Sequence, residues 1–383
     1  MAKPATQKEL AELVAAGGRF ELMGSGSKRG LGRPMPPATI LDMSGFNGIT
    51  LYEHDELVLD AGAATPLDDI EKTLAKNHQQ LAFEPPDYSK LLGATSRGTL
   101  GGLMACGLSG PRRIKAGAAR DHILGFTGVS GRGEMFKAGG RVVKNVTGFD
   151  ISKLMAGSYG TLAAMTGITM KVLPAAETEE TLVLSGLDDA RAITVMSLAL
   201  QSSCEVSGAA HIPGNPALTF LRLEGVRPSV FYRRDKLALL LKDFAACDVL
   251  ALDKSRVQWL AIRDVHPLAD EQQRHVWRLS VAPSLGAATV AKISAGIDAR
   301  YYYDWAGGLI WLSLPASADA SVDIVRGSFQ EGHATLMRAP EDVRARVEVF
   351  QPQGEALAAL TARVKNSFDP AGAFNFGRMY RNH

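Results

Sequence analysis

Residues 98–110 read GTLGGLMACGLSG, with five glycines in thirteen positions. The surrounding region is also rich in glycine, because 16 of the chain's 39 glycines lie between Gly93 and Gly160. Paired glycines such as Gly101 and Gly102 let a backbone pass close to a flat ligand or a pyrophosphate. Glycine pairs also form ordinary turns in β-rich proteins, so this stretch alone leaves both interpretations open.

A loop nearer the N-terminus has the character of a phosphate-binding turn. Residues 24–28 read GSGSK and follow a strand that we predict at 20–23. Successive backbone N–H groups in such a loop form a nest for phosphate oxygens, and Lys28 adds a charge-assisted contact. The glycine spacing matches neither a P-loop nor a dinucleotide fingerprint. A plain surface turn is the alternative.

The composition is that of an ordinary globular protein of two or three domains. Of 383 residues, 46% are hydrophobic and 21% charged, and the net charge of +2 predicts no nucleic-acid binding. The three cysteines, Cys106, Cys204 and Cys247, form no disulfide, zinc or iron–sulfur motif. We therefore expect a cytoplasmic chain without a bound metal. Neither a signal segment nor a membrane-spanning run is apparent, so we expect membrane contact only through partners.

Hydrophobic periodicity divides the chain at about residue 175. Before it, we expect helices at 7–16 and after Thr65, which we predict as an N-cap, and strands at 20–23, 39–41, 57–61 and 168–172. After an acidic linker at 175–181, we expect helices at 187–201, 232–246, 284–297 and 317–329. The strands expected there are 204–211, 218–224, 275–281 and 309–314. A last helix is expected at 352–367.

The order of the glycine motifs resembles a known family of flavoproteins. The GSGS loop, Pro85-Pro86-Asp87, GTLGG, RDHILG (120–125), residues 139–174 and FDPAGAFNFGR (368–378) resemble the vanillyl-alcohol oxidase and p-cresol methylhydroxylase (PCMH) superfamily. SGPRRIKAGAARDHILG, WRLSVAPS (277–284) and YYYDWAGGLIWL (301–312) resemble more specifically the FAD-binding E subunits of bacterial glycolate oxidases.

This resemblance implies an α+β fold. A two-lobed PCMH-type FAD-binding domain would occupy 1–175, with lobes of about 1–60 and 61–175. An α/β cap domain would occupy 176–350, and a C-terminal segment, 351–383, would return to the flavin. The cofactor-binding positions that it implies are Gly24, Ser25, Gly26, Ser27, Lys28, Pro85, Pro86, Thr99, Leu100, Gly101, Gly102, Cys106, Gly107, Ser109, Gly160, Ile168, Asn375 and Arg378. No histidine stands in the first glycine loop, so we expect noncovalent FAD.

The function implied is that of an FAD subunit in a multi-subunit glycolate oxidase, in which glycolate becomes glyoxylate. Its partners would be a second FAD-binding subunit and an iron–sulfur subunit, with a peripheral place at the inner membrane through them. Two alternatives stay open. One is a self-sufficient FAD-dependent 2-hydroxy-acid dehydrogenase, and the other is a non-catalytic flavin-domain scaffold.

Oxidation of a 2-hydroxy acid requires a cation for the carboxylate and a base for the hydroxyl proton. Arg222 and Arg278, on predicted cap strands, are candidates for the cation, although either could pair with a core acid. His275 is a candidate base, with a structural histidine as the plain alternative. The segment 112–153 has nine Lys and Arg against three Asp and Glu, so it and the cap are candidate docking faces.

Overall fold

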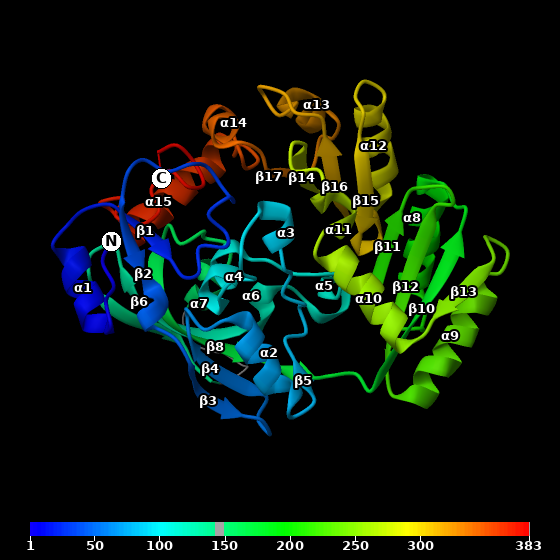
Figure 1. Ribbon diagram of the computed structural model, residues 1–383, viewed down its shortest axis with the longest axis horizontal. Helices are drawn as coiled ribbons and strands as arrows, with labels where there is room; N and C mark the ends of the chain where they lie inside the picture. The colour runs from blue at the N-terminus through cyan, green and yellow to red at the C-terminus, as the bar shows by residue number, and fades with distance from the viewer. Residues whose placement is uncertain (142–148, 383) are drawn as a thin grey trace. The chain divides into compact units, whose positions relative to one another are not determined.

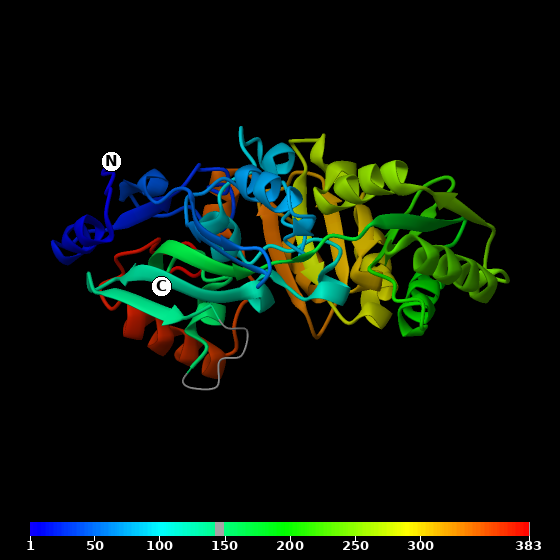
Figure 2. The ribbon, with the colours of Figure 1, turned by 90° about the horizontal axis from the view of Figure 1, so that it is seen from below.

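Three stretches of chain build a first unit, residues 1–109, 117–175 and 348–383, and two build a second unit, residues 110–116 and 176–347. The computed structural model describes residues 1–141 and 149–382. Both units are mixtures of helices and sheets (Figures 1 and 2). Within the described residues, no helix is long and apolar enough to cross a bilayer.

The first unit is built around a five-stranded antiparallel sheet in the order β3-β4-β8-β6-β7. Its strands are β3 (Ile49–Glu53), β4 (Val58–Gly62), β8 (Ala163–Lys171), β6 (Ile123–Ser130) and β7 (Met135–Gly139). A parallel pair, β1 (Phe20–Met23) and β2 (Thr39–Asp42), forms a separate small sheet. A third pair joins β5 (Gln79–Gln80) to β9 (Leu173–Pro174).

Seven α-helices of the described residues belong to the first unit. They are α1 (Gln7–Ala15), α2 (Leu67–Ala75), α3 (Ser89–Leu92), α4 (Leu100–Cys106), α6 (Ala119–His122), α7 (Ile151–Met155) and α15 (Glu355–Phe368), with a 3₁₀ turn, η1 (Met43–Gly45). Thr6 caps α1 by accepting from the Glu9 N–H at 3.2 Å. The predicted cap of α2 is wrong, because the Thr65 hydroxyl instead donates to the Gly62 carbonyl at 2.7 Å and the helix starts after Pro66.

The C-terminal segment returns to the small sheet of the first unit (Figure 1). The Phe20 N–H donates to the Ala373 carbonyl at 2.7 Å, and the Asn375 N–H donates to the Phe20 carbonyl at 3.0 Å. Phe374 is fully buried with Leu10 and the β1 side chains in one apolar cluster. Burial of these apolar groups holds the last residues of the chain against the first strand.

The second unit contains an eight-stranded antiparallel sheet in the order β13-β10-β12-β11-β15-β16-β14-β17. Its strands are β10 (Thr178–Ser185), β11 (Gly208–Ile212), β12 (Leu218–Gly225), β13 (Cys247–Leu250), β14 (His275–Ser280), β15 (Arg300–Asp304), β16 (Leu309–Leu314) and β17 (His333–Arg338). Strands β13, β15 and β17 were not predicted from the sequence, because these short segments lack a clear alternation of apolar and polar residues.

Helices cover both faces of this sheet. The helices of this unit are α5 (Arg113–Ala116), α8 (Asp189–Gln201), α9 (Arg227–Leu241), α10 (Leu252–Arg263), α11 (His266–Ala269), α12 (Gly286–Ser294), α13 (Val322–Gly327) and α14 (Glu341–Arg346), with 3₁₀ turns η2 (Pro283–Leu285) and η3 (Trp305–Gly307). Glu180 of β10 pairs with Arg234 of α9, whereas its neighbour Thr181 accepts from Trp259 of α10. Because adjacent strand residues point to opposite faces, α9 and α10 lie on opposite faces.

Candidate cofactor site

A cavity opens within the first unit. Four segments line it: the loop after β1, the start of α4, the turn before β8 and the C-terminal tail. The lining residues that the sequence also predicted are Gly24, Ser25, Gly26, Ser27, Lys28, Thr99, Gly101, Gly102, Cys106, Gly160, Asn375 and Arg378. Segments that are distant in the sequence therefore converge on one cavity.

The loop after β1 presents unused backbone donors to this cavity. Among the described residues, the N–H groups of Ser25, Gly26, Ser27 and Lys28 have no acceptor. The loop is closed by the Arg29 N–H, which donates to the Gly26 carbonyl at 3.2 Å. Consecutive free N–H groups at one concave surface suit the oxygens of a phosphate. The predicted phosphate loop therefore leaves its backbone donors unpaired within the described residues.

The start of α4 contributes surface rather than donors. The N–H groups of Leu100 and Gly101 donate to the carbonyls of Thr65 at 3.0 Å and Ala63 at 2.7 Å. The Gly102 N–H donates to the Thr99 hydroxyl at 3.3 Å. Because these donors are already paired, we expect α4 to offer a ligand close van der Waals contact with its glycines.

Glycine is required where the two loops meet. A Cβ on Gly24 would lie 2.8 Å from the Thr99 Oγ1, and one on Gly98 would collide with Ser27 and Lys28. Gly98 also has a φ of +109°, which residues with a Cβ rarely adopt. A Cβ on Gly102 would meet only ordinary contacts, 3.5 Å from Thr99 Oγ1. Gly24 and Gly98 thus let the two loops pack closely, and Gly24 and Gly102 line the cavity.

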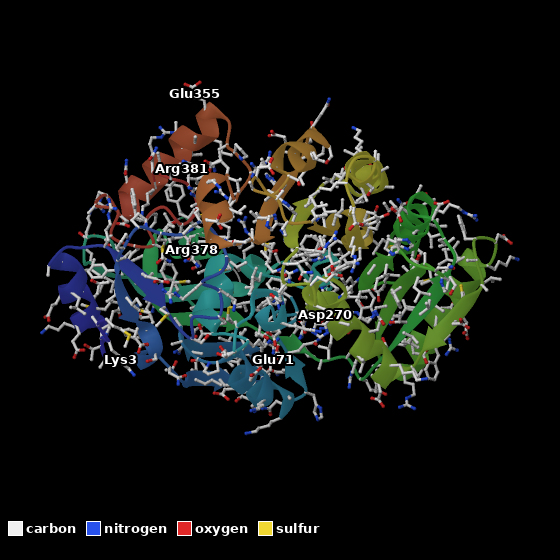
Figure 3. All side chains as sticks on the ribbon, turned by 45° about the horizontal axis from the view of Figure 1, so that its top comes forward. Lys3, Glu71, Asp270, Glu355, Arg378 and Arg381 are labelled. Atoms are coloured by element: carbon white, nitrogen blue, oxygen red, sulfur yellow. The ribbon has the colours of Figure 1, made fainter. Side chains whose placement is uncertain are left out.

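Two cations, Lys28 and Arg378, line the cavity. The Lys28 ammonium donates to the Arg97 carbonyl at 3.0 Å, and Arg378 donates to the Lys28 carbonyl at 2.8 Å (Figure 3 labels Arg378). Burial lowers the pKa of both cations. Burial raises the pKa of the neighbouring Cys106 thiol, and the two cations offset part of this effect. The thiol is therefore neutral at pH 7, and the cavity favours an anionic ligand.

Asn375 ties two walls of the cavity together. Its Oδ1 accepts from the Leu22 N–H at 2.9 Å, and its Nδ2 donates to the Tyr159 carbonyl at 2.7 Å. A Cβ on Gly160, whose φ is +70°, would lie 2.7 Å from this Nδ2. The amide of Asn375 is thus used in holding the walls, so the residue shapes the cavity more than it offers groups to a ligand.

A second, more open cavity adjoins the first along β4 and β8. Ala61 and Gly62 line it, whereas the next residues along the chain, Ala63 and Ala64, line the first. Ile168, predicted near the adenosine, lines this second cavity. Two adjoining cavities suit an elongated dinucleotide such as FAD.

Five predicted positions lie in the packing around the cavities. The Pro85 carbonyl accepts from Arg97 at 2.5 Å, and the Ser109 hydroxyl accepts from the Ala119 N–H at 2.9 Å. Gly107 ends α4 with a φ of +61°, while Leu100 and Pro86 are buried. These residues support the walls and do not line either cavity in the described part of the chain.

Several lining residues were missed by sequence reasoning. They are Glu21, Leu22, Met23, Met43, Ala63, Ala64, Ala105, Tyr159, Ala163 and Met165. Most are small or apolar, and their place depends on the pairing of β4 with β8, which no local motif signals. Tyr159 alone had a local sign, since it stands before Gly160 in the small-residue turn.

The three candidate catalytic residues do not form one site. Arg222 of β12 is 1% exposed, stacks on Trp259 and pairs with Glu224 at 3.3 Å. Burial opposes the ionisation of Glu224, but Arg222 and Arg112 outweigh it and lower the pKa of that carboxyl to about 2. The other two candidates lie on β14. Three strands lie between β12 and β14, which puts these two strands about 19 Å apart at the usual strand spacing.

His275 and Arg278, both on β14, differ in how far solvent reaches them. His275 is 1% exposed, its Nδ1 has no partner among the described residues, and burial lowers its pKa. A proton acceptor needs to reach its substrate, so His275 is a poor base in this state. Arg278 is half-buried, and its guanidinium carbon lies 5.0 Å from the centre of the Trp305 ring.

The basic segment 112–153 is largely engaged within the chain. Arg112 binds Glu224 at 2.7 Å, Lys115 binds Glu205 at 3.4 Å, and Arg141 binds Asp60 at 3.0 Å. Lys144 and Asn145 lie outside the described residues. The charge excess in the sequence therefore overstates the basic surface left for a partner.

Comparison with known proteins gives the same picture of the first unit. A family model described as an FAD binding domain matches residues 1–139. Glycolate oxidase subunit GlcE of Escherichia coli (strain K12) is 32% identical over 368 residues, or 94% of this chain and 92% of that protein. This chain belongs to the GlcE family of glycolate oxidase subunits. The expected FAD cofactor, oxidoreductase class and family are confirmed by these matches.

Other relatives match shorter parts of the GlcE-family chain. D-lactate dehydrogenase of Anaerostipes hadrus is 30% identical over 45% of this chain and 33% of that protein. Glycolate oxidase subunit GlcD of Bacillus subtilis (strain 168) is 36% identical over 26% of this chain and 21% of that protein. A solved structure of alkyldihydroxyacetonephosphate synthase has a TM-score of 0.69 at 16% identity, covering 100% of this chain and 75% of that one. The expected α+β fold with an FAD-binding domain is confirmed.

FAD is expected to protect Cys106 from alkylation. Cys106 lines the cavity, whereas Cys204 is fully buried and Cys247 lies half-buried in the second unit. With N-ethylmaleimide at pH 8.5, Cys106 should be alkylated in the free chain. The rate of this alkylation should fall as the ratio of the FAD concentration to its Kd rises. Mass spectrometry gives the site. Cys247 is the internal control, and an unchanged Cys106 rate under saturating FAD would place the cofactor elsewhere.

Proposed function

We propose that this chain is the FAD-binding subunit of a multi-subunit glycolate dehydrogenase, in which glycolate loses two electrons and two protons to become glyoxylate. The observation that carries the proposal is the GlcE likeness along 94% of the chain, joined to a cavity with free phosphate-loop donors. The same likeness supports a role within an assembly, because the relative is named as a subunit.

Within this proposal, the loop 24–28 holds the pyrophosphate and Lys28 balances its charge. Gly102 and the Gly160 turn give the flat ring close contact, and the second cavity takes the adenosine end. When bound, FAD supplies a two-electron acceptor. Attachment is noncovalent, supported by a lining without histidine among the described residues and a Cys106 thiol kept neutral by burial.

The partners we propose are a second FAD-binding subunit and an iron–sulfur subunit. The sequence has three separate cysteines and no dinucleotide fingerprint, so it offers neither an iron–sulfur relay nor a nicotinamide site. Among residues 1–141 and 149–382, no group of His, Cys, Asp and Glu is arranged to hold a metal ion. Electrons from the flavin therefore leave through another protein. Membrane contact, if the assembly makes it, runs through these partners.

Arg278 is the residue that we propose for binding the glycolate carboxylate. Of the two candidate cations, Arg222 already has its charge paired with Glu224. Arg278 makes no ion pair with any described residue, and it lies over Trp305 beside Arg113, whose guanidinium carbon is 4.6 Å from the same ring. A half-buried guanidinium without a counter-charge favours a carboxylate, which it can bind in a bidentate manner.

The substitution Arg278→Gln in the complete assembly is expected to raise the KM for glycolate more than it lowers kcat. Loss of a charge-assisted hydrogen bond costs about 1.5–3 kcal/mol, which corresponds to about 10- to 100-fold in KM. Steady-state kinetics with a dye acceptor measures both constants. Arg256→Gln, at an exposed position of the same unit, is the control. An unchanged KM for Arg278→Gln would remove this residue from the site.

A further inference from the structure

Helix α15 of the first unit buries one of its fourteen residues, and that residue is a lysine. Leu357 and Leu360 on the same helix are 52% and 47% exposed, whereas the Lys365 side chain is 5% exposed. A surface helix ordinarily buries its apolar residues and exposes its charges. Because burying a cation is costly, a reversed pattern of this kind marks a residue with a specific role.

The Lys365 ammonium uses all three of its donors. It donates to Asp369 Oδ2 at 2.5 Å, to the Thr161 carbonyl at 2.6 Å and to the Phe374 carbonyl at 3.4 Å. Asp369 is fully buried and accepts in turn from the backbone N–H groups of Ala373 at 2.7 Å and Phe374 at 2.8 Å. The pair is thus a satisfied buried ion pair that joins two separate segments of backbone.

Each of these segments leads directly into a wall of the cofactor cavity. Thr161 follows Gly160, and Phe374 precedes Asn375, and both Gly160 and Asn375 line the cavity. At the wall itself, Asn375 donates to the Tyr159 carbonyl at 2.7 Å. Asn375 joins the Gly160 turn to the C-terminal tail at the cavity wall. The ion pair joins the same two segments one residue away from that wall.

The turn between β6 and β7 closes the pair off from a third side. The Gly131 N–H donates to the Phe368 carbonyl at 2.9 Å, and a Cβ on Gly131 would collide with the Asp369 carboxylate. Such close packing leaves no room for solvent beside the carboxylate. In this dry setting the attraction between the two charges is stronger than at a surface, so the linkage is stiff.

We propose that Lys365 and Asp369 are positioning residues that hold the Gly160 turn and the Asn375–Arg378 tail at the separation FAD requires. This inference rests on the proposed function, since it takes FAD as the ligand. Neither side chain lines the described cavities, so their influence on the cofactor passes through Thr161 and Phe374. Their removal should weaken FAD binding beyond any general loss of stability.

The test is the double variant Lys365→Met with Asp369→Asn, which removes both charges and leaves no buried charge alone. We expect a folded chain by circular dichroism and an FAD Kd raised at least about tenfold. The rise in Tm on adding FAD depends on the FAD concentration over Kd, so it should shrink in this variant. A merely structural role would lower the Tm of the free chain and leave that rise unchanged. Lys72→Met, at an exposed position of α2, is the control.

Hydrogen exchange on the unmodified chain tests the same inference without a variant. FAD should slow exchange of the Ala373 and Phe374 N–H groups, which bind Asp369 and lie off the cavity. An unchanged FAD affinity in a folded double variant, or unchanged exchange at both amides on FAD binding, would overturn the inference. An unmodified chain that binds no FAD would overturn the proposed function instead.

Discussion

The substitution Gly102→Val is expected to weaken FAD binding about 10- to 100-fold while the free chain stays folded. The Cβ at this position meets only ordinary contacts with Thr99 and Lys28, so the fold accepts it. Its two methyl groups then project toward the cavity that Gly102 lines. Overpacking of this kind costs about 1–3 kcal/mol, and each 1.4 kcal/mol is a tenfold change in Kd. FAD titration followed by flavin fluorescence measures the change.

Gly101 provides the contrast. A Cβ there would lie 2.8 Å from the Ala63 carbonyl oxygen, which already accepts the Gly101 N–H at 2.7 Å. Gly101→Val should therefore lower the Tm of the free chain by several degrees, unlike Gly102→Val. Wild-type FAD affinity in the Gly102→Val chain would show that this face of α4 is not part of the cradle.

The isolated chain is expected to oxidise glycolate with an artificial dye at less than about one hundredth of the rate of the full assembly. Proton removal needs a base that reaches the substrate, and the candidate base His275 is 1% exposed. Activity should return when the partner subunits are added.

Two outcomes would redirect this account of the assembly. Full turnover by the isolated chain, at about ten per second or more, would favour a self-sufficient 2-hydroxy-acid dehydrogenase. Full activity of an assembly in which this chain carries no flavin would favour a non-catalytic scaffold. A raised KM in the Arg278→Gln assembly would show that this chain binds glycolate and would count against the scaffold.

The parts of the site that local sequence chemistry controls were predictable. The GSGSK and GTLGG segments could be picked out by their composition, because glycine and serine allow a tight loop with free backbone N–H donors beside a ligand. Asn375 and Arg378 followed from resemblance alone, and the pairing of Phe20 with Phe374 explains how they reach the cavity.

Other parts depend on contacts that no local pattern reveals. Ala63 and Ala64 enter the cavity wall through the long-range pairing of β4 with β8. Arg222 was a candidate for substrate binding, but its partner Glu224 lies two residues away on the same strand, where side chains share a face. Lys365 was not singled out, because helix periodicity assigns a lysine to solvent unless a buried carboxylate receives it.

The absorption spectrum of the isolated, purified chain titrated with FAD tests the central claim most directly. We predict saturation at one FAD per chain, a shifted flavin spectrum, and complete release of the yellow colour into the supernatant after acid precipitation. A chain that retains no FAD at micromolar concentration would contradict the claim that this chain is a flavin subunit. Colour that stays in the acid pellet would contradict noncovalent binding.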